Sequence, residues 1–89
     1  MKAVITVIGN DSVGIIAGIS TVLSENNVNI IDINQTIMGG MFTMVMMVEL
    51  DKNETDFSSL NDILVAKGTD LGVQVIVTRE EIYKSMHRI

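Results

Sequence analysis

Residues 28–50, VNIIDINQTIMGGMFTMVMMVEL, contain two strand-like segments joined by a glycine pair. In the first segment, residues 28–38, apolar side chains alternate with polar ones, which is typical of a strand with one buried face. Gly39 and Gly40 can adopt the positive φ angles of a two-residue hairpin turn. We therefore predict a β-hairpin in which residues 41–50 form the returning strand.

The position of the turn determines which residues face each other across this hairpin. We expect the pairs Ile37–Phe42, Ile33–Met46 and Ile31–Val48 on the face that the helices cover. The opposite, open face then carries Asp32, Asn34, Thr36, Met38, Met41, Thr43, Val45 and Met47. A surface this apolar usually marks a contact, and a homodimer is the simplest way to cover it.

The segments on either side of the hairpin add two strands and three helices. Residues 3–8 are apolar on both faces, as in a central strand, and residues 73–78 form the last strand.

Residues 13–26 have helical spacing, with one stripe formed by Ile15, Ile16, Ile19, Val22 and Leu23. A second helix begins at an N-cap, Thr55 or Asp56, and packs through Phe57, Leu60, Ile63 and Leu64, with Gly68 and Gly72 at its exit. Thr78 to Glu81 is a capping box, which predicts a short helix at about 79–88 with one face formed by Ile82, Met86 and Ile89.

This order, β-α-β-β-α-β plus a short C-terminal helix, is the ferredoxin-like arrangement, an α+β two-layer sandwich. Right-handed crossovers place two helices on one face of an antiparallel sheet with the strand order 4-1-3-2, so the second strand is an edge. The 89 residues suit a single domain, residues 1–89, with a core of residues 2–79.

Composition argues against several classes of partner and of chemistry. The formal net charge of −5 disfavours a nucleic-acid partner, because phosphate binding needs clustered Lys and Arg. The chain has no Cys, and its only His, His87, belongs to no metal-ligand pattern, so we expect no metal and no cofactor. We see no secretory signal and no apolar run of about 18 residues, so we expect a cytoplasmic protein without membrane contact. Ser12 has no nearby base, which argues against an enzyme.

The segment GNDSVG, residues 9–14, links the first strand to the first helix. Free amides at the helix start, those of Val13, Gly14 and Ile15, would attract a carboxylate, and Asp11 could accept hydrogen bonds from an ammonium group. Together these groups match an α-amino acid. The alternative is structural: Asp11 or Ser12 caps the helix, and Gly14 and Gly18 allow close packing of helix on sheet.

The second strand adds two amide side chains. Asn34 should lie on the open face, and Gln35 should lie among the helix-facing residues, where a buried amide needs a partner. Water, a neighbouring subunit or a ligand could each hydrogen-bond to the Gln35 amide. The alternative is that this amide is satisfied at the edge of the sheet and has no further role.

Residues 7–50 resemble an ACT domain, and the resemblance extends over nearly the whole chain. It rests on Asp11-x-x-Gly14 in its strand–loop–helix context, on NVNI at residues 27–30 and on INQ at residues 33–35. In particular, the chain is similar to small stand-alone bacterial ACT proteins related to the amino-terminal half of the glycine cleavage system repressor. The resemblance implies a regulatory module that binds an amino acid or another small metabolite at a subunit interface. It also implies side-by-side pairing through sheet edges and helices, with the apolar face as a second contact in a tetramer.

Carried over to this chain, the implied binding residues are Asn10, Asp11, Ser12, Val13, Gly14 and Ile15, with Asn34 and Gln35 of the partner subunit. We therefore expect a non-catalytic, homo-oligomeric sensor, a dimer or a tetramer, that binds a small amino acid or a related metabolite. The alternative is a protein-interaction adaptor without a small ligand, whose methionine-rich face and terminal helix bind an unknown protein partner. Asp11→Asn should separate the two, because only the sensor would lose amine recognition.

Overall fold

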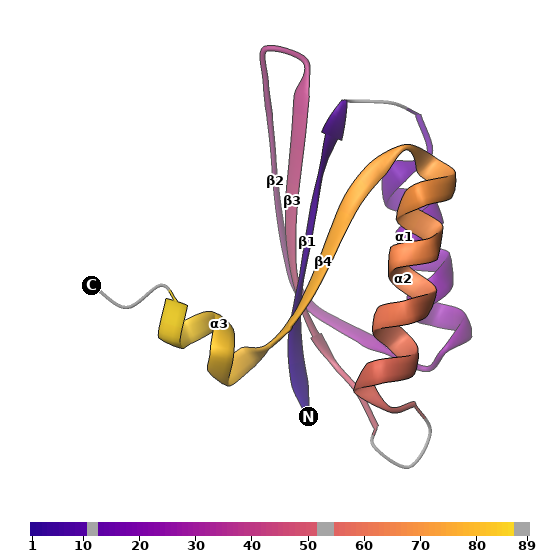
Figure 1. The fold of residues 1–89 in the computed structure, drawn as a ribbon, viewed down its shortest axis with the longest axis vertical. Helices are drawn as coiled ribbons and strands as arrows, with labels where there is room; N and C mark the ends of the chain where they lie inside the picture. Colours follow the sequence, from indigo (N-terminus) through magenta and orange to yellow (C-terminus); the bar gives the residue numbers. More distant parts are fainter. Residues whose placement is uncertain (11–12, 52–54, 87–89) are drawn as a thin grey trace.

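A computed structural model describes residues 1–10, 13–51 and 55–86 (Figure 1). Its elements are β1 (Lys2–Asn10), α1 (Ile15–Glu25), β2 (Asn29–Met38), β3 (Met41–Glu49), α2 (Phe57–Leu71), β4 (Val73–Arg79) and α3 (Glu80–Met86). The strands form one antiparallel sheet in the order β2-β3-β1-β4. Read from the other edge this is the predicted order 4-1-3-2, so the ferredoxin-like fold is confirmed. Helices α1 and α2 lie on one side of the sheet, the core face, and α3 lies on the other, the α3 face (Figure 1).

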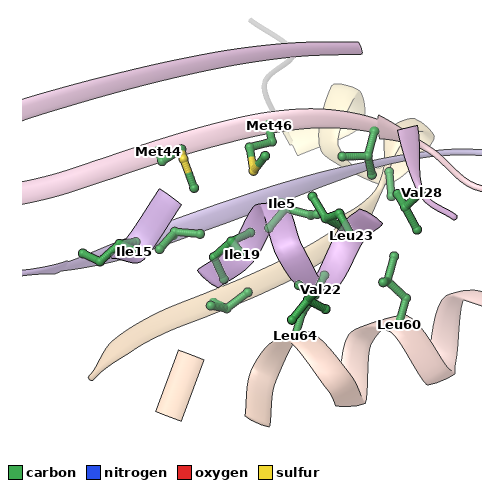
Figure 2. Close-up of a cluster of buried hydrophobic side chains, with 14 of the residues drawn as sticks. Ile5, Ile15, Ile19, Val22, Leu23, Val28, Met44, Met46, Leu60 and Leu64 are labelled. Atoms are coloured by element: carbon green, nitrogen blue, oxygen red, sulfur yellow. The ribbon is translucent and has the colours of Figure 1, made fainter. Parts of the chain in front are cut away.

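The core lies between the sheet and the two long helices. Strand β1 runs through the middle of the sheet and contributes Ala3, Ile5 and Val7, which are fully buried. The side chains of α1, α2 and β3 that meet them are shown in Figure 2, among them Ile19, Leu23, Met44, Met46, Leu60 and Leu64. Ile16 and Ile63, which the helical spacing also placed in the core, are exposed instead. The buried stripe of each helix is therefore narrower than its apolar spacing predicts.

The β2–β3 hairpin forms as predicted around its glycine pair. Gly39 and Gly40 have φ angles of 58° and 80°, and Met38 pairs with Met41 beside them. The predicted pairs Ile37–Phe42 and Ile33–Met46 are also present. The predicted pair Ile31–Val48 is wrong, because a β-bulge makes Ile31 an extra residue and Val48 pairs with Ile30 instead. As a result Ile30 packs against the core, whereas Asp32 faces Met47 on the α3 face.

The ends of α2 agree with the sequence in part. Asp56, one of the two predicted caps, accepts a hydrogen bond from the Ser59 N–H at 2.9 Å, and Thr55 instead donates its hydroxyl to the Asn26 carbonyl at 2.7 Å. The Ser59 N–H and hydroxyl together hold the pKa of Asp56 below its ordinary value of 3.8. Gly72 ends the helix with a φ of 75°.

Gly68 and Gly18 lie at close contacts of the two long helices. Helix α2 ends at Leu71, between Gly68 and Gly72 as predicted, and Gly68 is buried against β4, where an added Cβ would be 2.6 Å from Val75 Cγ2. Gly18 faces Leu71 of α2 rather than the sheet, so it allows close contact between the two helices. The expectation that Gly18 packs on the sheet is therefore wrong, whereas Gly68 is the glycine that lies against a strand.

Helix α3 begins at Glu80, and Thr78 still belongs to β4, so the predicted capping box lies too early in the chain. The helix contacts β1 and β4 on the α3 face. Val4, which is 1% exposed and lies outside the core cluster, is buried on this side of the sheet. The predicted open face is therefore covered at one end. Ile82 and Met86 remain exposed on α3, and Ile89 lies outside the described residues.

Candidate functional site

The loop predicted to hold the ligand follows the end of β1. Asn10 is the last residue of β1 and is exposed, and Val13 and Gly14 form an exposed turn before α1. Ile15 is the first residue of α1, and its side chain is buried in the core. Asp11 and Ser12 lie outside the described residues. The described part of the loop therefore offers backbone groups and the Asn10 amide, whereas the Ile15 side chain is committed to packing.

Gly14 is the N-cap of α1, with a φ of 94° that favours glycine. An added Cβ would meet nothing within 4 Å, so the backbone conformation, not a close neighbour, requires glycine here. The predicted capping by Asp11 or Ser12 concerns residues outside the described part of the chain. The first bond within the helix runs from the Gly18 N–H to the Gly14 carbonyl at 2.8 Å. The amides of Ile15, Ile16 and Ala17 therefore have no partner inside the helix, and the helix dipole makes this end favourable for an anion.

The two amides of β2 lie on opposite faces of the sheet. Asn34 pairs with Val45 and Gln35 with Met44, and both amide side chains belong to exposed residues. The expectation that Gln35 is buried is wrong, because α1 and α2 leave β2 uncovered from Ile31 onward. Gln35 lies two strands from β1 and is aligned with Val7, so about 10 Å of sheet separates it from β1. One protomer therefore does not bring the loop and Gln35 together.

The outer edge of β2 is apolar, and no strand of the described chain pairs with it, although the outward Ile33 N–H donates to Asp32 Oδ1. On its core face Ile33 is 43% exposed and Ile37 is 57% exposed. A two-residue hairpin turn makes Met38–Met41 a hydrogen-bonded pair, so by alternation the backbone groups of Ile33, Gln35 and Ile37 point away from β3. A long apolar edge whose backbone N–H and C=O groups point outward is a template for pairing with another strand.

A groove of about 480 Å³, which we name the edge groove, lies between α1 and the start of β2. It is lined by Ser20, Leu23, Ser24, Asn27, Val28, Asn29 and Ile30. Its polar groups are hydroxyls and amides without formal charge, and its apolar groups belong to the edge of the core. Sequence reasoning missed this groove. The sequence feature that indicates it is the Asn26-Asn27 pair at the end of α1. Asn27 adopts a φ of 57°, a conformation that Asn tolerates well after a helix.

A smaller hollow of about 210 Å³, the α3 hollow, lies on the other side of the sheet. It is lined by Asp32, Ile33, Asn34, Val45, Met47 and Tyr83. Asn34 therefore lines a hollow that one protomer forms alone. This hollow lies on the α3 face of the sheet, whereas the edge groove is bordered by α1 on the core face.

The family model for the ACT domain matches residues 2–78 of this chain. The chain belongs to the ACT domain family. A UPF0237 protein from Methanocaldococcus jannaschii is 53% identical over 88 residues, which are 99% of this chain and 98% of that protein. A solved ACT domain protein from Streptococcus pneumoniae is 40% identical, with a TM-score of 0.83 and 93% of each chain covered. Relatives of this ACT domain therefore occur beyond bacteria.

A third comparison bears on the fold of the ACT domain alone. A solved structure described as a glycine cleavage system transcriptional repressor is 23% identical, with a TM-score of 0.78 over 88% of this chain and 44% of that one. Within the described residues, no group of three or more His, Cys, Asp or Glu could hold a metal ion. None of the described helices is long and apolar enough to cross a bilayer.

Proposed function

We propose that this ACT domain is a non-catalytic regulatory module that binds a small amino acid or related metabolite between two copies of the chain. One observation carries the proposal: the exposed, apolar outer edge of β2 adjoins a groove lined by neutral hydrogen-bonding groups. A ligand in that groove would be covered only when a second chain lies along the edge. Binding and assembly would then be coupled, because each adds contacts that the other needs.

The geometry of strand pairing indicates what the second chain would bring. Two β2 strands related by a two-fold axis run antiparallel, so the start of one strand lies beside the hairpin end of the other. Asn10 pairs with Met41 at that same end of the sheet. The loop before α1 of the partner subunit would thus approach the edge groove, and Gln35 would lie near the axis.

This arrangement divides the recognition of an amino acid between two chains. The free amides at the start of α1 favour the ligand carboxylate, and Asp11 is proposed to accept from its ammonium group. Ser24, Asn27 and Asn29 of the edge groove supply neutral donors and acceptors for the remainder of the ligand. Ile33 and Ile37, exposed in one chain, would be covered on the core face of the joined sheet.

The adaptor function has its own support. Met38 is 76% exposed and Met86 is 69% exposed, and Met41 and Ile82 are exposed as well. Flexible methionine side chains suit a surface that adapts to another protein. Under this alternative the edge groove has no ligand and β2 pairs with a different chain.

The test combines a ligand screen with a change at the β2 edge. Wild-type protein is screened by thermal shift against the twenty amino acids, since a ligand at about 100 times its Kd adds about 2.7 kcal/mol of stability. Gln35→Pro removes an outward N–H without removing a bond to β3, and Gln35→Ala is the control that keeps this N–H. We expect the proline variant to be a folded monomer without ligand response, and the alanine variant to behave as wild type in sedimentation.

Two outcomes would contradict the proposal. If no amino acid shifts the melting temperature of the wild type, the adaptor function is favoured. If Gln35→Pro retains both assembly and ligand response, the β2 edge is not the site of pairing. Asp11→Asn tests the ammonium contact separately, because it should abolish the response and leave the dimer intact.

A further inference from the structure

The α3 hollow is formed by three elements that come from distant parts of the sequence. Val45 and Met47 of β3 are half-buried and form its floor, and Asp32 and Asn34 of β2 form one wall. Tyr83 of α3 forms the opposite wall. The hollow thus exists in one protomer, and α3 shapes it without filling it.

The backbone explains why these side chains converge. The hairpin register places Asp32 opposite Met47 and Asn34 opposite Val45, on the α3 face. The extra residue at the bulge separates Asp32 from Ile30, which packs against the core on the other side. Helix α3 contacts β1 and β4 beside the hollow, which brings Tyr83 to its rim.

The described residues that line the hollow carry one formal charge, the carboxylate of Asp32. The Ile33 N–H donates to Asp32 Oδ1 at 2.8 Å, which orients the carboxylate and leaves Oδ2 able to accept another donor. No ion pair of Asp32 is found in residues 1–10, 13–51 and 55–86. Lys84, the cation nearest to Tyr83 along α3, lies 3.8 Å from Glu80. Among the described residues that line the hollow there is no Lys or Arg, and the Asp32 carboxylate is the only formal charge.

We propose that the α3 hollow binds a small organic cation: a primary or methylated ammonium group carried on a short apolar chain. The carboxylate of Asp32 and the ring of Tyr83 both attract an ammonium group, the ring through its negative face. The Asn34 carbonyl adds a neutral acceptor, and Val45 and Met47 contact the alkyl chain. A volume of about 210 Å³ holds about seven water-sized groups at about 30 Å³ each, which suits an amine of a few carbons.

This site is formed by one chain and shares with the proposed pairing edge only Ile33, whose outward N–H donates to Asp32 Oδ1. It uses residues of one chain on the α3 face, whereas the edge groove lies between α1 and β2 and needs a second chain. The monomeric Gln35→Pro variant should therefore still bind an amine here, so failure of one proposal leaves the other untouched.

The probe is n-butylamine, titrated into the 15N-labelled full chain at constant pH and ionic strength, with n-butanol and butyrate as neutral and anionic controls. We expect saturable shifts for the amides of Asp32, Asn34, Val45, Met47 and Tyr83 with the amine alone. Asp32→Asn should weaken binding about tenfold or more, because a hydrogen bond to a charged group is lost. Asp62→Asn, at an exposed carboxylate on α2, removes the same charge far from the hollow and should leave the affinity unchanged.

Three results would overturn the proposal. Equal weakening by Asp32→Asn and Asp62→Asn would mean that the amine responds only to the net charge of the chain. Equal binding of butylamine and butanol would mean that no ammonium contact exists. Shifts that do not saturate, or that map away from the hollow, would mean that there is no site. A wild-type-like spectrum of free Asp32→Asn shows that the variant is folded.

Discussion

Replacing Gly68 with alanine tests how tightly α2 packs on β4. In a helix interior this change ordinarily stabilises by about 1 kcal/mol, because alanine has the higher helix propensity. Here the added Cβ would lie 2.6 Å from Val75 Cγ2 and 3.0 Å from the Val73 carbonyl oxygen. That oxygen belongs to the backbone of β4, which the ladder to β1 holds in place, so the helix itself must move.

The two effects oppose each other, and the packing effect should be larger. Overfilling a packed interior costs about 1–3 kcal/mol, so the net change at Gly68 is a loss of up to about 2 kcal/mol. For a domain of this size each kcal/mol shifts Tm by about 4–8 °C. Gly18→Ala is the matched control, since its Cβ would meet only the mobile ends of Leu71 at 3.0 Å and Lys67 at 3.3 Å.

Thermal and urea unfolding of both variants, at one protein concentration, measure the difference. We expect Gly18→Ala to be as stable as wild type or more stable, and Gly68→Ala to melt several degrees lower. If Gly68→Ala melts at or above the wild-type temperature, α2 does not lie as close to β4 as described.

Three further predictions concern the helix ends and the core. Gly14→Ala should cost about 1–2 kcal/mol, because φ is 94° there, and Gly14→Asn should cost less; urea unfolding compares the two. Asp56→Ala should lower Tm above pH 3.8, and the difference should shrink at lower pH. The depressed pKa of Asp56 means that its contribution is full above the unfolded value and is lost as pH falls through the folded one. Leu64→Ala should lower the free energy of unfolding by about 2–5 kcal/mol, because the Leu64 side chain is fully buried between α2 and the sheet. A loss below about 1 kcal/mol in urea unfolding, as for an exposed side chain, would contradict that burial.

The fold was predictable because patterns among residues that are close in sequence determine most of its strands and helices. The Gly39-Gly40 turn determines the hairpin register, and the alternation of apolar residues around it determines which face is buried. The bulge at Ile31 was not predictable, because an extra residue shifts the pairing without leaving any turn residue in the sequence. Its effect was to move Ile30 to the core.

The candidate site was less predictable because it depends on how far the helices reach. The alternation of apolar residues places Gln35 among buried positions. The two helices leave this part of β2 uncovered, however, so Gln35 is exposed. Periodicity likewise identified α3 as a helix but gave no information on where it lies. The structure shows that α3 follows β4 directly and contacts β1 and β4 on the face where Val4 is buried.

The central place of β1 has a consequence for how the chain folds. Its neighbours are β3 and β4, so Lys2 pairs with Glu49, about half the sequence away, and Ala3 pairs with Arg79, almost the whole sequence away. Contacts between such distant segments slow folding, because a long loop must close before any of them forms. Until then a strand that is apolar on both faces stays unpaired, and such a segment readily joins other chains. The β2–β3 hairpin covers one edge of β1 and β4 covers the other, so both must be in place before β1 is fully paired.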